Sequence, residues 1–162
     1  MRAFLLWRGH AVVALPLRLY LGMIFIYASM HKIANPGVFA LDIATYDLLP
    51  LTLVNPMAII MPYLEFVVGM QFIVAWRTRA AGLLITGMMA IFVIAVSVAL
   101  AKGLDTSCGC FASQAMEEDP INGLTILRDV AWLLMGTYVT LFDRRPLGLD
   151  GLLMRRRKSN ER

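Results

Sequence analysis

The two cysteines are the residues of this chain best suited to chemistry. Cys108 and Cys110 flank Gly109 in a short polar stretch between two long apolar segments. A disulfide closing so short a loop stabilises a fold poorly: the chain-entropy model gives about 1.6 kcal/mol for about three residues and about 3 kcal/mol for about fifteen. Strained or exposed disulfides tend to be the labile, catalytic ones, and glycine lets the backbone close the bond. The spacing therefore favours thiol–disulfide exchange, in which one thiolate forms a mixed disulfide and the other resolves it.

Three other interpretations of the cysteine pair stay open at this point. They are a structural disulfide, two buried free thiols, and a site for a soft ion such as copper(I) or mercury(II). The chain has no third cysteine, and no histidine stands out as a partner, so we expect no metal site. We expect Cys108 to attack, because Phe111 follows Cys110 and favours burial of that sulfur.

Glu65 lies near the middle of an apolar segment, about 18 Å from either end of it. An acid at membrane depth is a functional-site hypothesis by default, and the alternative is a structural pair with a basic residue of another helix. Lys32 lies in the last turn of the first apolar segment, where anchoring at the membrane interface would by itself explain it.

Arg128 and Asp129 lie one to two turns into the last apolar segment. Adjacent helical residues point about 100° apart, so we expect them to face different neighbours. One would meet Glu65 or Lys32 and the other would face the cysteines. A nearby cation lowers the pKa of a thiol and raises its thiolate fraction. We therefore predict that these four residues form a polar cluster that tunes the cysteines or relays protons.

Long apolar segments must position these residues. The chain of 162 residues is 59% hydrophobic and 16% charged, whereas a soluble domain carries roughly 25% charged residues. A spanning helix needs about 20 mostly apolar residues, and four segments reach that length: Ala11–Ala34, Leu53–Trp76, Ala80–Ala101 and Ile121–Phe142. The sequence predicts an all-α membrane protein, a four-transmembrane-helix bundle over residues 1–145 with a basic cytoplasmic tail at residues 146–162.

Two shorter features complete the predicted bundle. Apolar and acidic residues alternate through residues 36–53, which predicts an interfacial amphipathic segment between helices 1 and 2, able to cover the bundle. Residues 1–10 resemble the start of a signal peptide, but the apolar run continues too far, and we expect a retained first helix. Within that helix, Arg18 is expected to snorkel toward the membrane surface.

The positive charges predict the orientation. Eleven of the fifteen Lys and Arg residues lie at the N-terminus, between the second and third segments, or in the tail. Positive charge is retained on the cytoplasmic side, so both termini are expected there and the cysteines on the opposite side. In a bacterium this is a multi-pass inner-membrane protein with a periplasmic thiol pair, where disulfides persist. The net charge of +4 is explained by lipid contact, and we expect no nucleic-acid partner.

Short motifs over roughly residues 15–135 are typical of one family. They are Arg18 with Gly22, Lys32-Ile33-Ala34-Asn35-Pro36 with Phe39, Tyr46 with Leu49-Pro50, Pro62-x-x-Glu65 with Gly69, Cys108-Gly109-Cys110-Phe111, and Arg128-Asp129. In these the chain resembles the MauE/DoxX family of small four-helix membrane proteins, specifically its MauE-like, cysteine-bearing branch. That family's loop usually reads Cys-Gly-Cys-Phe-Gly, and Ala112 replaces the last glycine here.

The resemblance implies a redox-associated membrane protein that helps to mature disulfide-containing periplasmic proteins, typically beside a thioredoxin-like partner. By analogy with other four-helix thiol oxidoreductases it also suggests electron exchange with quinone, although the sequence contains no quinone motif. The predicted function is a membrane thiol–disulfide oxidoreductase. The alternatives are a soft-metal carrier or transporter and a non-catalytic assembly factor for a periplasmic enzyme.

Overall fold

The computed structural model describes residues 10–103 and 123–143, and the cysteine segment and the predicted tail lie outside these ranges. Within them the chain forms five α-helices and no strand. The helices are α2 (His10–Ala34), α3 (Pro36–Thr45), α4 (Leu51–Val74), α5 (Thr78–Ala101) and α6 (Gly123–Phe142).

Four of these helices, α2, α4, α5 and α6, are long and apolar enough to cross a membrane. They confirm the four predicted segments, and the described ends differ from the predicted ones by no more than two residues. The hydrophobic run determines where each helix begins and ends, because every backbone polar group inside lipid must form its hydrogen bond within its own helix. The all-α, four-helix membrane fold is therefore confirmed.

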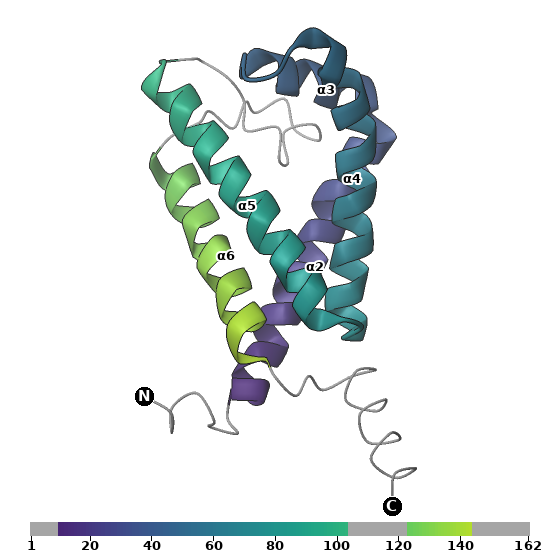
Figure 1. Cartoon of the computed structure of the whole chain (residues 1–162), viewed down its shortest axis with the longest axis vertical. Coiled ribbons are helices and arrows are strands. Elements are labelled where there is room, and N and C mark those ends of the chain that lie inside the picture. Colours follow the sequence, from purple (N-terminus) through teal and green to yellow (C-terminus); the bar gives the residue numbers. More distant parts are fainter. Residues whose placement is uncertain (1–9, 104–122, 144–162) are drawn as a thin grey trace, which may run out of the picture.

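The four long helices form a ring in which α2 packs on α4, α4 on α5, α5 on α6, and α6 on α2. Neighbours in the ring run in opposite directions (Figure 1). The start of α2 and the end of α6 share one end of the bundle, here called the terminal end. The other, here called the α3 end, carries α3 (Figure 1). The described part of the chain thus begins and ends at the same end of the bundle (Figure 1).

Small residues let the helices approach closely in two places. A Cβ atom added at Gly22 of α2 would lie 2.9 Å from the carbonyl oxygen of Gly69 of α4, and one added at Gly69 would lie 2.9 Å from the oxygen of Gly22. A Cβ added at Gly82 of α5 would collide with the hydroxyl of Thr140 of α6. Close backbone approach is a common way to pack helices in lipid, and here it joins α2 to α4 and α5 to α6.

A short helix, α3, forms within residues 36–53, where the sequence predicts an interfacial amphipathic segment. Asn35 separates it from α2, and Pro36 begins it, where the missing N–H of proline is harmless. The helix lies against α4 and α2, and Tyr46, which follows it, packs with Val96 and Ala99 of α5. The segment therefore contacts three of the four long helices and covers their shared end.

Candidate functional site

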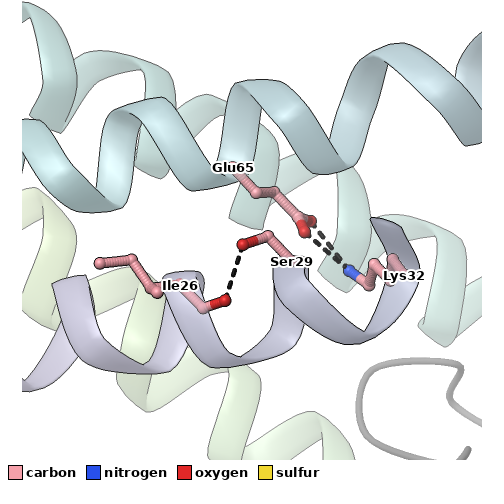
Figure 2. A network of polar contacts seen from close by, with 4 residues as sticks. All are labelled: Ile26, Ser29, Lys32 and Glu65. Carbon is pink, nitrogen blue, oxygen red and sulfur yellow. Dashed lines mark hydrogen bonds and ion pairs between the residues drawn. The ribbon is translucent and has the colours of Figure 1, made fainter. Parts of the chain in front are cut away.

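A buried ion pair joins α2 to α4 near the α3 end. Lys32 Nζ donates to both carboxylate oxygens of Glu65, at 2.9 Å to Oε1 and 3.0 Å to Oε2, and each side chain is 9% exposed. Figure 2 shows the two side chains pointing toward each other across the helix interface. Ser29, one turn before Lys32, donates instead to the carbonyl oxygen of Ile26 at 2.7 Å. Of the possibilities predicted for Glu65, pairing with a base from another helix is the one found.

The same ammonium group reaches the covering helix. Lys32 Nζ lies 4.9 Å from the centre of the Phe39 ring of α3, within cation–π distance. It also interacts electrostatically with Asp42 of α3, a half-buried residue. Burial raises the pKa of the Asp42 carboxyl above its usual value of 3.8, and the positive charge of Lys32 offsets part of that rise. Lys32 therefore links α2, α3 and α4.

Arg128 and Asp129 form a second ion pair within α6. Arg128 Nε donates to Asp129 Oδ1 at 3.2 Å, and the guanidinium lies 4.9 Å from the centre of the Trp132 ring. Asp129 is fully buried, whereas the Arg128 side chain is 32% exposed. Their different burial fits the 100° separation on the helix. The sequence did not predict the contact between them, which forms because the long arginine side chain reaches back to the aspartate.

A cavity of about 250 Å³ opens at the α3 end. Lys32, Asp42, Glu65 and Asp129 all line it, and most of the remaining lining is apolar or aromatic. The apolar part includes Phe25, Met57, Met61, Met88, Phe92 and Trp132. Three of the predicted site residues thus meet in one cavity, and Arg128 is joined to it through Asp129 and Trp132.

The cysteines themselves lie outside the described residues, so the geometry of Cys108 and Cys110 stays a prediction. The described residues on either side of their segment are Gly103, which follows α5, and Gly123, which begins α6. Both of these helix ends lie at the α3 end (Figure 1). The chain that carries the cysteines therefore leaves and re-enters the bundle at the end that holds the cavity.

A polar cluster that the sequence did not predict lies at the terminal end. Arg18 Nη1 of α2 donates to Asp143 Oδ2, just after α6, at 3.1 Å, and each side chain is 1% exposed. His10 Nδ1 and the Tyr138 hydroxyl lie 2.8 Å apart. The expectation that Arg18 snorkels to the surface is wrong, because a carboxylate inside the bundle stabilises its charge. The sequence feature that could have indicated this pair is an acid directly after the last span, together with a base in the first span.

Within residues 10–103 and 123–143, no group of three or more His, Cys, Asp and Glu side chains is arranged to hold a metal ion. Among the ionisable groups of the cavity, Lys32 pairs with Glu65 and Asp129 pairs with Arg128. Chemically, the site offers an ammonium, three carboxyl groups and an apolar, partly aromatic wall, an arrangement suited to proton transfer and to binding a small apolar molecule that carries a polar group.

The fold and the site define a small multi-pass membrane protein whose helices enclose buried ion pairs at both ends. The family model for the methylamine utilisation protein MauE matches residues 4–142. The chain belongs to the MauE family, as its motifs had suggested.

Curated relatives are distant. Methylamine utilization protein MauE of Paracoccus denitrificans is 23% identical over 70% of this chain and 61% of its own length. The protein of that name from Methylorubrum extorquens is 27% identical over 79% of this chain and 63% of its own length. The one from Methylophilus methylotrophus is 26% identical over 86% of this chain and 72% of its own length. The chain thus spans about three-fifths of the length of the first two. No solved structure is significantly similar to it.

Proposed function

We propose that the chain is a membrane thiol–disulfide oxidoreductase, in which Cys108 and Cys110 exchange with a periplasmic thioredoxin-like or disulfide-bearing protein. The observation that supports this most is the position of the cavity. Lys32, Glu65 and Asp129 line it at the end of the bundle where the cysteine segment begins and ends. Ionisable groups buried in a membrane protein are expensive and mark functional sites.

The exchange moves two electrons and two protons between the partner and the pair. A thiolate of one protein attacks a sulfur of the other protein's disulfide, and a mixed disulfide forms as one S–S bond breaks. The second thiol of the attacking protein then displaces the remaining sulfur. Each departing sulfur gains a proton, and we infer that the buried carboxyl groups of the cavity, Glu65 and Asp129, supply or accept it. We assign Arg128, partly exposed five residues after Gly123, the role of stabilising a thiolate.

Trapping the mixed disulfide tests this function. Cys110→Ser leaves Cys108 without its resolving thiol, so this variant should accumulate a covalent adduct that mass spectrometry identifies. The matched variant Cys108→Ser should accumulate little adduct if Cys108 is the attacking residue. A normal redox state of periplasmic partners in cells carrying either variant would overturn the proposal and favour a non-catalytic assembly factor. Tight one-to-one binding of copper(I) by the reduced protein would favour a soft-metal carrier.

The setting of the proposed exchange follows from the charges and from the relatives. Basic residues at both termini and beside the α4–α5 turn favour an inner-membrane protein with cytoplasmic termini and periplasmic thiols. The curated relatives are named for methylamine utilization. We infer that the partner of this chain belongs to the machinery of methylamine use.

A further inference from the structure

We propose that the cavity at the α3 end binds the ring of a lipid-soluble quinone, which accepts the electrons of the Cys108 and Cys110 thiols. The inference rests on the proposed function for its redox step, but the binding site is argued from the cavity alone. Four observations support it: the size of the cavity, its lining, its opening, and the balance of the reaction.

The size of the cavity suits a ring-sized ligand. An engineered protein cavity of about 150 Å³ binds benzene, and drug-sized ligands need about 300–1,000 Å³. At about 250 Å³ the present cavity exceeds the first and falls short of the second. One substituted ring fits in it.

The lining matches a flat, apolar ring that carries carbonyl oxygens. Phe25, Phe92 and Trp132 supply aromatic faces for stacking. An ammonium has three N–H donors, and Lys32 gives two of them to Glu65. A third donor remains beyond those two bonds, at the edge of a cavity in which a quinone oxygen would accept it. A lipid acyl chain would gain nothing from these ionisable groups.

Two residues of the cavity lining are exposed on the outside of the bundle. They are Met57 of α4 and Ile91 of α5, which are 37% and 63% exposed, respectively. The two helices are neighbours in the ring, and we infer that the cavity opens to lipid between them. An isoprenoid tail leaving the cavity there would enter the bilayer directly, while the ring stays under α3.

The redox step balances with the two thiols and one quinone, and it needs no further reactant. The two thiols lose two electrons and two protons and form one S–S bond. The quinone gains two electrons and two protons and becomes a quinol. Asp42, half-buried at the α3 end, and Asp129, a fully buried residue of the same cavity, can pass protons between water and the ring. The resulting disulfide is then ready to oxidise the periplasmic partner.

Fluorescence of Trp132 tests the binding site directly. The chain has three tryptophans, so Trp7→Phe with Trp76→Phe leaves only the one that lines the cavity. Cys108→Ser and Cys110→Ser, added to this background, remove the thiol chemistry. Titration with decylubiquinone in nanodiscs should then quench Trp132 saturably, with a defined Kd. Quenching that rises linearly, without saturation, would overturn the site.

Variants that fill the cavity sharpen the test. Ala95→Phe places a ring in the cavity wall and should weaken binding about tenfold or more, which corresponds to about 1.4 kcal/mol. Ala80→Phe makes the same change at an exposed position of the same helix, near its other end, and should leave Kd unchanged. If Ala95→Phe does not fold, Ala28→Leu, which fills the cavity from the opposite wall, replaces it and should also weaken binding. Equal Kd values in folded cavity variants and control would also overturn the site.

The outcomes separate this inference from the proposed function. Saturable binding without any trapped partner would keep the quinone site and remove the exchange reaction. A trapped partner without saturable binding would do the reverse. With the cysteines restored and reduced, the protein should convert the quinone to the quinol, and Ala95→Phe should slow this at limiting quinone concentration. A trapped partner and saturable binding without quinol formation would overturn the electron transfer.

Discussion

Lys32 of α2 lies where three helices meet, and its ammonium has partners on the other two. On α4 it makes a two-oxygen hydrogen bond with Glu65, on α3 it lies over the Phe39 ring, and its own stem belongs to α2. Such a charge is stable in an apolar bundle only while its carboxylate stays within reach. Removing the ammonium of Lys32 therefore leaves the Glu65 carboxylate without its cation and takes away a contact of α3.

Breaking the pair from one side should be more harmful than removing both partners. Lys32→Met leaves the Glu65 carboxylate buried without its cation, and we expect a loss of about 3–5 kcal/mol in the free energy of unfolding. The double variant Lys32→Met/Glu65→Leu should recover most of that loss. Lys102→Met changes an exposed lysine and should stay within about 0.5 kcal/mol of the parent. Denaturant titration in micelles measures all three, and equal stabilities of single and double variants would contradict the prediction.

Asp42 should make the docking of α3 depend on pH. Its pKa is raised by burial above the usual 3.8, so between these two pKa values the folded state binds more protons than the unfolded state. Stability is then greatest below pH 3.8 and falls as pH rises through the raised pKa. Asp42→Asn should remove this part of the pH dependence and stabilise the protein at neutral pH. Melting temperatures of both proteins from pH 4 to pH 8 test it, and parallel curves would argue against it.

At the scale of the element, the α2–α4 contact depends on two glycines. Atoms added at Gly69 meet the backbone oxygen of Gly22, which cannot rotate away as a side chain could. Gly69→Ala should therefore push the helices apart and lower stability by about 1–3 kcal/mol. Gly87→Ala is the matched control, since nothing lies within 4 Å of its added Cβ, and it should be neutral or stabilising by about 0.5–1 kcal/mol. Equal effects in micelle unfolding experiments would rule out the close contact as the cause.

Hydrophobic length was enough to predict the four long helices. The lipid requirement for internal backbone hydrogen bonds acts on each span separately, so α5 could be placed from its own residues without knowledge of its neighbours. The break at Asn35 and Pro36 is equally local, because proline removes a donor and restricts the residue before it. These are properties of neighbouring residues, which a sequence states directly.

The pairing of the charges was not local and could not be predicted in full. Pairing of Glu65 with a base of another helix was one of the possibilities left open, and the sequence did not say which base it would be. Arg18 and Asp143 are 125 positions apart, and only the packing of α2 on α6 brings them together. The cavity depends on how far the helices separate at the α3 end, a property of the whole assembly.

At the scale of the whole molecule, the two ends of the bundle should lie on opposite sides of the membrane. A membrane-impermeant maleimide added to spheroplasts should label the reduced Cys108 and Cys110. In a variant without these cysteines, Ala80→Cys, beside the α4–α5 turn, should react only after the membrane is opened. Mass spectrometry of the labelled protein reads both results. Labelling of Cys108 and Cys110 only from the cytosol would reverse the orientation and remove access to periplasmic partners.

The Arg18–Asp143 pair has a consequence for how the protein is made. Arg18 enters the membrane with the first span, but the carboxylate that meets it follows the last span, 125 positions later. A nascent chain must hold an arginine in lipid until synthesis of α6 is complete, at a cost of about 2.5–3.5 kcal/mol if it sat at the bilayer centre and less near the surface. A chain truncated before α6 keeps that exposed charge, which gives membrane proteases a means of recognising unfinished copies.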